Sequence, residues 1–249
     1  MKTELNFSGP ELCGLEAHQV VAMLKAGDVS SAELLDAATQ RTSKTGPMIN
    51  ATPTLCEARA RGAVLNPREM GHAGWLAGLP ISIKDLNTVA GVRTTYGTKG
   101  LADFIPEDSD PLIEQLEARG GVVLGKTNTP EFGAGGNTFN DVFGSTLNPW
   151  DISLNAGGSS GGAAASLAAG EIWLSHGSDH GGSLRTPAAY CGVVGLRPSP
   201  GIAGGPGKDN AFMIEGVQGP MARSVTDCAL FLDAMSGFDP RLPISYPGP

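Results

Sequence analysis

Two short segments rich in glycine and serine stand out in the middle of the chain. Residues 157–162 read Gly-Gly-Ser-Ser-Gly-Gly, so Ser159 and Ser160 lie between two glycine pairs, directly before an alanine-rich stretch. Residues 177–185 place another serine, Ser183, after a further pair of glycines. Hydroxyl groups next to glycines are typical of flexible loops, of phosphate-binding turns and of sites where the backbone must approach a ligand closely. The two segments are therefore the first candidates for chemistry.

Phosphate binding does not fit these segments well. A P-loop needs the pattern GxxxxGK[ST] and a dinucleotide site needs GxGxxG, and neither pattern is present. The formal net charge of -8 also argues against binding to nucleic acid or to an anionic membrane, because both need clustered Lys and Arg. We therefore expect a small or neutral molecule as the partner, with no nucleic acid and no membrane.

A lysine upstream completes the pattern. Lys84 ends a segment in which residues 79–84 alternate in the manner of a strand. Together with the two serine segments, this stretch closely resembles the amino-terminal half of the amidase signature family, whose members use a Ser-cisSer-Lys triad. The likeness covers most of residues 75–240 and continues in the family's order and spacing through residues 91–95, 125–132, 148–150, 192–198 and 219–223.

The resemblance implies a role for each of three side chains. Ser183 is implied to be the nucleophile, Ser159 the bridging serine and Lys84 the base that starts the proton relay. A serine hydroxyl attacks poorly unless a neighbouring base removes its proton, and a lysine is such a base only where burial disfavours its ammonium form. We therefore expect Lys84 to be neutral at rest. The family also has a cis peptide bond before the bridging serine, which here implies a cis bond between Gly158 and Ser159.

The backbone around Ser183 is expected to stabilise the oxyanion of the reaction. The N–H groups of His180, Gly181, Gly182 and Ser183 are the candidate donors for this oxyanion hole. Paired glycines allow a backbone to approach a substrate carbonyl without a side chain between them.

Three further polar residues near the serines are expected to support the site. Asp179 and Arg185 flank the loop of Ser183, and we expect them to fix its backbone through hydrogen bonds or an ion pair. Ser160 is expected to cap the helix that follows it. Lys126 is a rival base, but it follows a different strand and lies in a stretch whose role in the family is structural.

The reaction implied by the resemblance is hydrolysis of a linear carboxamide to an acid and ammonia or an amine, through an acyl-enzyme on Ser183. It needs no metal and no organic cofactor. An alternative is the amidase subunit of a glutamine-dependent tRNA amidotransferase, although residues 129–132 and 217–221 are more similar to stand-alone amidases. A third hypothesis is a truncated, non-catalytic remnant that serves only as a folded or binding module. Assembly as a homodimer is left open.

The histidines and cysteines indicate neither a metal site nor disulfides. His18, His72 and His176 stand apart from one another and from carboxylate clusters in the sequence, so we expect no metal site. The four cysteines, at positions 13, 56, 191 and 228, have no zinc-type spacing and are expected to be free buried thiols, which fits a cytoplasmic location. We find no signal-peptide pattern and no run of eighteen apolar residues, and therefore expect neither export nor membrane spanning.

Periodicity and capping signals predict the elements around these residues. Helix starts are indicated by the capping-box pairs Ser30 with Glu33 and Thr54 with Glu57, and by a proline at position 111. The order of strand, helix and strand indicates an α/β sheet with some parallel pairing, and functional residues should gather at strand ends. The predicted helices cover residues 15–26, the segment after 30, 57–61, 110–119, 162–170 and 224–237, and the predicted strands cover 79–84, 121–125 and 172–174.

The resemblance also implies the overall architecture, which is the α/β amidase signature fold with a mixed β-sheet core flanked by helices. We expect a single domain over residues 1–249, with N-terminal helices over about 1–65, a catalytic core over about 75–237 and an irregular tail over 238–249. Members of the family are longer than this chain, and their later half adds strands to the sheet and walls to the pocket. We therefore expect the fold to be incomplete.

Overall fold

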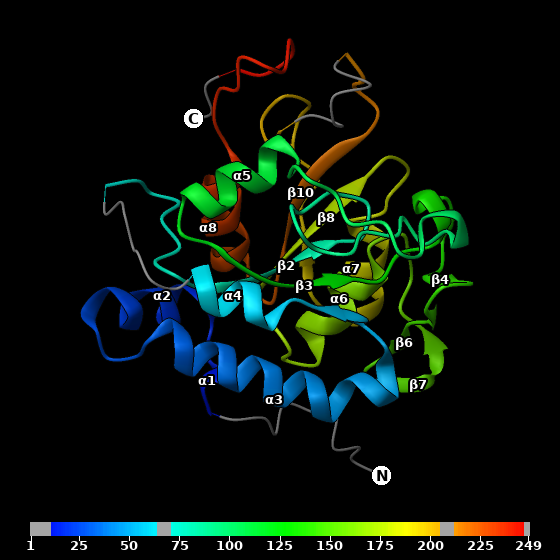
Figure 1. Cartoon of the computed structure of the whole chain (residues 1–249), viewed down its shortest axis with the longest axis horizontal. Helices are drawn as coiled ribbons and strands as arrows, with labels where there is room; N and C mark the ends of the chain where they lie inside the picture. Colours follow the sequence, from blue (N-terminus) through cyan, green and yellow to red (C-terminus); the bar gives the residue numbers. More distant parts are fainter. Residues whose placement is uncertain (1–10, 64–70, 205–211, 247–249) are drawn as a thin grey trace.

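A six-stranded mixed sheet lies at the centre of the computed structural model, which describes residues 11–63, 71–204 and 212–246 (Figure 1). The strand order is β1-β3-β2-β8-β10-β9. Strand β2 runs parallel to both of its neighbours, β3 and β8, whereas the other pairs are antiparallel. The bounds are β1 Thr54–Leu55, β2 Pro80–Lys84, β3 Val122–Thr127, β8 Leu174–Asp179, β9 Val194–Gly195 and β10 Val217–Ala222.

Helices surround this sheet. Helix α6 contacts β2, β3, β8 and β10, and α8 contacts β8, β9 and β10. All eight residues of α6 are buried, and their small side chains allow the helix to pack closely on the strands. The helices are α1 Glu11–Gly14, α2 Ala17–Ala26, α3 Ser31–Ile49, α4 Glu57–Ala63, α5 Pro111–Ala118, α6 Gly161–Ala168, α7 Arg185–Cys191 and α8 Val225–Met235, with 3-10 turns at Lys99–Leu101 and Glu131–Gly133.

Two small hairpins lie to one side of the central sheet (Figure 1). Strand β4 Phe139–Asn140 pairs with β5 Gly144–Ser145, and β6 Leu147–Asn148 pairs with β7 Asp151–Asn155. The central strands β2, β3 and β10 are buried at every position, as expected for strands that are covered on both faces. The mixed α/β fold expected from the sequence is confirmed.

Several predicted elements are found within one to three residues of their expected bounds. The capping box at the start of α3 is confirmed, because the Ser30 hydroxyl accepts from the N–H of Glu33 at 3.3 Å and the Glu33 carboxylate accepts from the N–H of Ser30 at 2.8 Å. Helix α2 ends at Gly27, whose φ of 79° is the left-handed conformation that glycine adopts at little cost. Ser224 caps α8, because its hydroxyl accepts from the N–H of Asp227.

Two predictions about local structure are wrong. Thr54 does not cap α4, because it lies in β1 opposite Lys126 and its hydroxyl has no partner in the described part of the chain. The apolar stretch over residues 172–174 is only the entry to a longer strand, since β8 runs from Leu174 to Asp179. The polar second half of β8 lacks a strand signal in the sequence, because Ser, Gly and Asp are poor strand formers when judged without the sheet around them.

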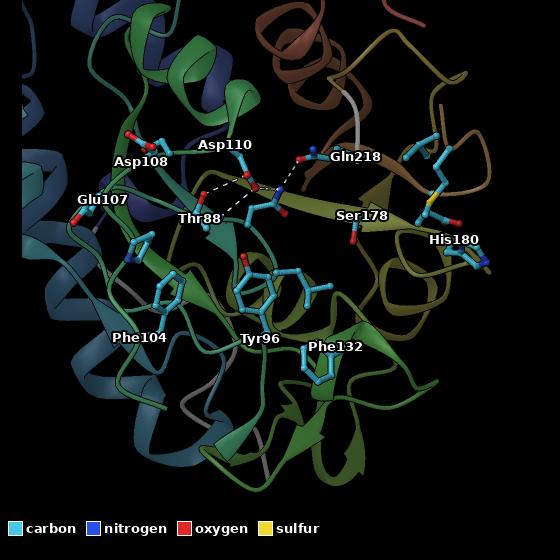
Figure 2. A pocket seen from close by; sticks show the side chains of 18 residues that line it. Thr88, Tyr96, Phe104, Glu107, Asp108, Asp110, Phe132, Ser178, His180 and Gln218 are labelled. Carbon is cyan, nitrogen blue, oxygen red and sulfur yellow. Dashed lines mark hydrogen bonds between the residues drawn. The ribbon is translucent and has the colours of Figure 1, made fainter. Parts of the chain in front are cut away.

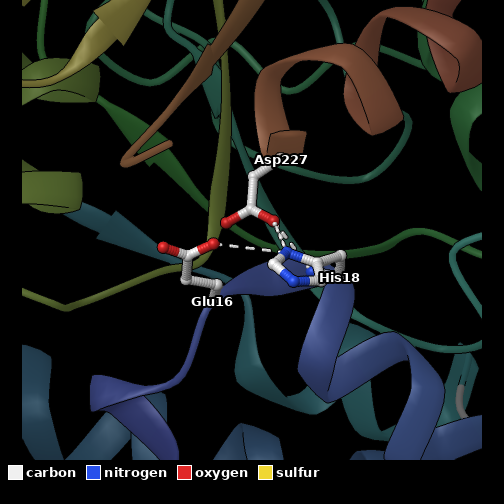
Figure 3. A group of neighbouring side chains, drawn as sticks. All are labelled: Glu16, His18 and Asp227. Atoms are coloured by element: carbon white, nitrogen blue, oxygen red, sulfur yellow. Dashed lines mark hydrogen bonds and ion pairs between the residues drawn. The ribbon is translucent and has the colours of Figure 1, made fainter. Parts of the chain in front are cut away.

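The prediction that His18 stands apart from carboxylates is also wrong in three dimensions (Figure 3). Its Nδ1 lies 2.8 Å from Asp227 Oδ1 and 3.3 Å from Glu16 Oε2. Asp227 also accepts from the N–H groups of Ala17 at 2.8 Å and His18 at 2.9 Å. A carboxylate that receives the free amides of a first helical turn acts as a cap. The group therefore fastens α2 to α8.

The cysteines and the helix lengths complete the description. All four cysteines are free, as predicted, and Cys13, Cys191 and Cys228 are buried whereas Cys56 is partly exposed. None of the helices described here combines the length and the apolar character that crossing a bilayer would require.

Candidate active site

Parallel pairing brings the candidate residues to one edge of the sheet. Lys84 is the last residue of β2, as predicted, and Ser178 and Asp179 end β8. Because β2 and β8 run parallel as neighbours, their carboxyl ends meet at the same edge. Ser159 and Ser160 reach this edge from the start of α6, which packs on both strands.

The Lys84 ammonium group lies among three serine hydroxyls. Its Nζ is 2.7 Å from Ser159 Oγ, 2.9 Å from Ser160 Oγ and 3.0 Å from Ser178 Oγ. The side chain is fully buried and forms no ion pair with any described carboxylate. Burial lowers the pKa of Lys84 to about 7, although the nearby charge of Asp179 acts in the opposite direction. A large share of the lysine is therefore neutral near pH 7.

The peptide bond between Gly158 and Ser159 is cis, which confirms the expectation from the sequence. The expectation for Ser160 is wrong, because its side chain makes no capping hydrogen bond to α6. The Ser160 hydroxyl instead accepts from Lys84 and lies 3.2 Å from the carbonyl oxygen of Ser178, to which it donates. Gly177 makes this approach possible, since a Cβ there would lie 2.9 Å from Ser160 Oγ.

Ser183 joins the group through its main chain. Its carbonyl oxygen accepts from the N–H of Ser160 at 3.2 Å. The half-buried Ser183 hydroxyl makes no hydrogen bond to Ser159 or to Lys84 in the described structure. Of the three residues expected to form one hydrogen-bonded line, Lys84 and Ser159 are thus in contact, and Ser183 is tied by its main chain to Ser160, the neighbour of Ser159.

Asp179 fixes the loop that carries Ser183. Its carboxylate accepts from Gly182 N at 2.8 Å and Leu184 N at 3.0 Å, and it pairs with Arg185 at 3.0 Å and Arg197 at 3.1 Å. Burial alone would raise the pKa of Asp179, but the hydrogen bonds from Arg185 and the two amides lower it well below its ordinary value. These are the kinds of contact that the sequence led us to expect for Asp179 and Arg185.

The same contacts narrow the choice of oxyanion donors. The N–H of Gly182 is already engaged by Asp179, and its φ of 112° shows why glycine is needed at this position. The N–H groups of His180, Gly181 and Ser183 donate to no acceptor within the described residues. Of the four amides expected from the sequence, these three, rather than Gly182, remain candidate oxyanion donors.

Comparison with known proteins identifies the family. The family model described as amidase matches residues 33–249. The chain belongs to the amidase signature family. It is 40% identical over 235 residues to a subunit of the glutamyl-tRNA(Gln) amidotransferase of Anaeromyxobacter dehalogenans, covering 93% of this chain and 48% of that protein. The corresponding subunit of a Synechococcus strain is 44% identical over 222 residues, covering 88% and 45% of the two chains. The chain thus spans about half the length of these relatives.

Solved structures of the family share the fold of this chain. A 6-aminohexanoate cyclic dimer hydrolase, solved with its substrate, is 34% identical with a TM-score of 0.86 and covers 95% of this chain and 49% of its own. A bacterial aryl acylamidase of the family is 32% identical, also with a TM-score of 0.86, and covers 94% and 50%. The two hydrolases therefore share this arrangement of strands and helices with the chain.

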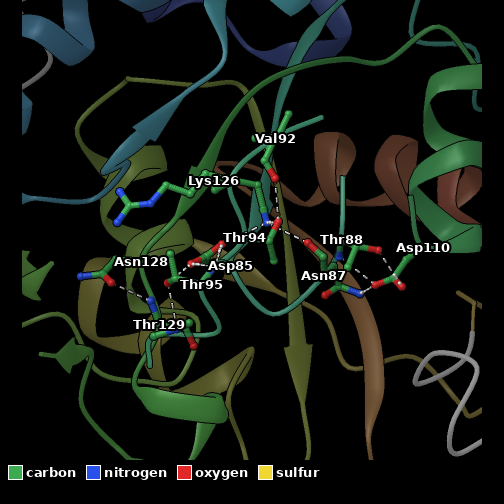
Figure 4. A network of polar contacts seen from close by, with 12 residues as sticks. Asp85, Asn87, Thr88, Val92, Thr94, Thr95, Asp110, Lys126, Asn128 and Thr129 are labelled. Atoms are coloured by element: carbon green, nitrogen blue, oxygen red, sulfur yellow. Dashed lines mark hydrogen bonds and ion pairs between the residues drawn. The ribbon is translucent and has the colours of Figure 1, made fainter. Parts of the chain in front are cut away.

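Lys126, the rival base, lies in a different environment within this amidase signature chain (Figure 4). Its buried Nζ is 3.0 Å from Asp85 Oδ1, 2.7 Å from the carbonyl oxygen of Asn87 and 2.8 Å from Thr94 Oγ1. Burial lowers the pKa of Lys126, and the charge of Asp85 opposes this effect. Asp85 in turn accepts from the hydroxyl of Thr95 at 2.6 Å. This ion pair holds the segment after β2 in place, which suits a structural role.

A pocket of about 650 Å³ opens beside the serine group (Figure 2). Ser178 and His180 lie on one side of it and Phe104 and Glu107 on the other, with Tyr96 between them, and Asp179 also lines it. The pocket thus shares Ser178, a hydrogen-bond partner of Lys84, with the serine group.

Sequence reasoning missed two residues of this site. Ser178 is a direct partner of Lys84, but the sequence alone places it only in the segment before Ser183. Arg197 forms a second ion pair with Asp179, but the sequence indicates its segment only through the resemblance to the family. The polar run at the end of a buried strand was a usable signal for Ser178, because such positions commonly line α/β active sites.

Proposed function

We propose that this chain carries the catalytic group of an amidohydrolase, with Ser183 as nucleophile, Ser159 as proton carrier and Lys84 as base. The observation that supports this most directly is the buried Lys84, whose close polar partners are three serine hydroxyls and whose pKa is lowered to about 7. A lysine in this state accepts a proton near neutral pH.

The reaction follows from these positions. As Ser183 Oγ bonds to the amide carbon, its proton passes to Ser159 and the Ser159 proton passes to Lys84. The tetrahedral oxyanion is stabilised by N–H groups of the loop that carries Ser183. The proton then returns along the same path to the amide nitrogen, the C–N bond breaks, and the amine leaves an ester on Ser183. Water then attacks the ester carbon and gives its proton through Ser159 to Lys84, and a proton returns to Ser183 Oγ as the ester C–O bond breaks and the acid leaves.

The first step requires the Ser183 and Ser159 hydroxyls to come into hydrogen-bond contact. The two segments are already joined by the hydrogen bond from Ser160 N to the Ser183 carbonyl, which keeps Ser183 next to the segment that carries Ser159. Catalytic hydrogen bonds are often long without substrate and tighten when it binds.

A second candidate is supported by the curated relatives named above, which are subunits of glutamyl-tRNA(Gln) amidotransferases. In that case the same group would release ammonia from glutamine for use by partner subunits. The hydrolases named above superpose with TM-scores of 0.86 and a solved glutamyl-tRNA(Gln) amidotransferase subunit with 0.78, so the fold is common to both candidates. Both candidates use the same nucleophile, so the substrate distinguishes them.

The test is release of ammonia or amine by the purified chain from benzamide, acetanilide and glutamine. We expect Ser183→Ala and Ser159→Ala to lose at least about 10³-fold in kcat. Ser153→Ala is the matched control, because Ser153 is exposed on β7 and hydrogen-bonded only to Asp151. A fluorophosphonate probe should modify Ser183 itself, as located by mass spectrometry of the labelled peptide.

Each outcome separates the candidates. Turnover of benzamide or acetanilide by the chain alone supports the stand-alone amidase, whereas turnover of glutamine only with added partner subunits supports the amidotransferase. Equal activity of Ser183→Ala and Ser153→Ala, or probe modification at another residue, would refute the assigned nucleophile.

A further inference from the structure

The lining of the pocket beside Ser178 carries an imbalance of charge. Four carboxylates line it, from Glu107, Asp108, Asp110 and Asp179, and the described residues contribute no lysine or arginine to its lining. Asp179 is neutralised by its two arginine partners. The other three carboxylates form no ion pair with a described residue.

Asp110 has a fixed position in the wall of this pocket (Figure 2). Its Oδ2 accepts from Asn87 Nδ2 at 2.8 Å and from Thr88 N at 3.2 Å, and its Oδ1 accepts from Thr88 Oγ1 at 3.2 Å. These donors are all neutral, so they orient the carboxylate without cancelling its charge. A carboxylate offers about four acceptor sites, and one therefore remains for a ligand.

The donor Asn87 is held in turn by its neighbours. Its Nδ2 also lies 3.0 Å from Gln218 Oε1, which accepts from His176 Nε2 at 2.7 Å. Burial lowers the pKa of His176 to about 3, so this imidazole is neutral and adds no positive charge behind the pocket. The buried cation Lys126 is paired with Asp85 at 3.0 Å, and its charge interacts with Asp110 only at longer range.

Aromatic side chains form the path between the acidic wall and the serine group. Tyr96 and Phe132 lie with ring centroids 6.5 Å apart, and Phe104 lines the pocket beside Glu107. Aromatic faces accept both apolar groups and cations, and they exclude an anion. The chemistry of the pocket is thus apolar near the reacting group and negative at the far side.

We propose that the substrates are amides that also carry a protonated amine, which the carboxylates of Asp110, Glu107 and Asp108 hold while the apolar part of the molecule lies along the aromatic side chains. This inference rests on the proposed amidase function and assigns its substrate class. A cation in a partly open acidic pocket gains a modest and salt-sensitive attraction. We therefore expect a preference of roughly three- to tenfold in kcat/KM.

The test compares amides of equal shape and different charge. One pair is 4-(aminomethyl)benzamide and 4-ethylbenzamide, with the cation on the acyl side. The second pair is N-[4-(aminomethyl)phenyl]acetamide and N-(4-ethylphenyl)acetamide, with the cation on the amine side. We expect the charged member of at least one pair to have the higher kcat/KM, and 4-(carboxymethyl)benzamide to be the poorest substrate.

Variants of the pocket carboxylates test whether the preference for charged amides arises there. In the double variant Glu107→Gln/Asp108→Asn and in Asp110→Asn, the charged-to-neutral ratio should fall toward one. Asp103→Asn is the matched control, since Asp103 is an exposed acid of the same loop that does not line the pocket, and it should keep the ratio. A preference that is absent in both pairs, or that survives in every pocket variant, would overturn the proposal.

Binding to Ser183→Ala separates this inference from the proposed function. The dissociation constants of both pairs are measured by ligand-observed NMR at low and high salt. Tighter binding of the charged amides that weakens with salt supports the pocket even if no amide is hydrolysed. If neutral amides are hydrolysed but neither rate nor binding depends on the charge of the amide, the proposed substrate class is refuted and the proposed amidase function is not.

Discussion

Replacing Lys84 by methionine should stabilise the protein at neutral and acidic pH. The substitution keeps a long unbranched side chain in a fully buried site and removes a group whose charged form is unfavourable there. It also removes three hydrogen bonds to serine hydroxyls, which costs about 1–3 kcal/mol at every pH. The part of the stability difference that changes with pH therefore measures the cost of burying the charged lysine.

The magnitude follows from the pKa. A lowering from the ordinary 10.5 to about 7 corresponds to about 5 kcal/mol of unfavourable free energy when charged Lys84 is buried. Below pH 7 the lysine is charged in both states and this cost is fully present. Between about pH 7 and 10.5 the unfolded chain holds one more proton, so wild-type stability rises by about 1.4 kcal/mol per pH unit. Above 10.5 the cost is gone.

The assay is urea unfolding of wild type and Lys84→Met at intervals from about pH 6 to 10. The difference between the two free energies of unfolding cancels the other titrating groups, and it should change by about 3 kcal/mol between about pH 7.5 and 9.5 in favour of the wild type. Lys126→Met is the contrasting variant, because it leaves Asp85 buried without its partner and should destabilise by about 3–5 kcal/mol. A difference for Lys84→Met that stays constant across this range would refute the reasoning.

Three further predictions concern the same edge of the sheet. Ser178→Ala removes one acceptor from the Lys84 ammonium and should move the acidic limb of the kcat/KM profile down by about one pH unit, measured with a neutral amide. Gly177→Ala places a methyl group 2.7 Å from a Leu184 carbon and 2.9 Å from Ser160 Oγ, which should lower the free energy of unfolding in urea by about 1–3 kcal/mol. Asp179→Asn weakens the hydrogen bonds that hold the loop of Ser183, the proposed nucleophile, and should reduce kcat by at least about tenfold while the melting temperature falls by only a few degrees.

Local signals in the sequence were enough to predict part of the fold. The capping box before α3, the proline-led start of α5 and the glycine that ends α2 are each determined by residues within one helical turn. The alternating segment that ends at Lys84 was long and apolar enough to be recognised as a strand. The three strands that were not predicted, β1, β9 and β10, are short or contain glycine and proline, and only their pairing makes them strands.

Local sequence signals were less able to predict which groups the site residues contact. The resemblance indicated Lys84, Ser159 and Ser183, but the role of Ser160 was wrong because its position before a helix suggested a cap. A hydroxyl at such a position bonds to whichever donor is closest in space. Here that donor is a lysine 76 residues away in the sequence, placed there by the packing of α6 on β2.

The two buried lysines show why burial alone does not identify a base. Both stand at or near the ends of adjacent parallel strands, both are fully buried, and burial lowers the pKa of each. Lys126 faces a carboxylate at 3.0 Å, so its charge is compensated and its proton is held. Lys84 faces only neutral hydroxyls, so either protonation state can be accommodated and a proton can move along them. This difference in partners, which arises from a single carboxylate on one side of β2, places Lys126 in an ion pair and suits Lys84 to the proposed role of base.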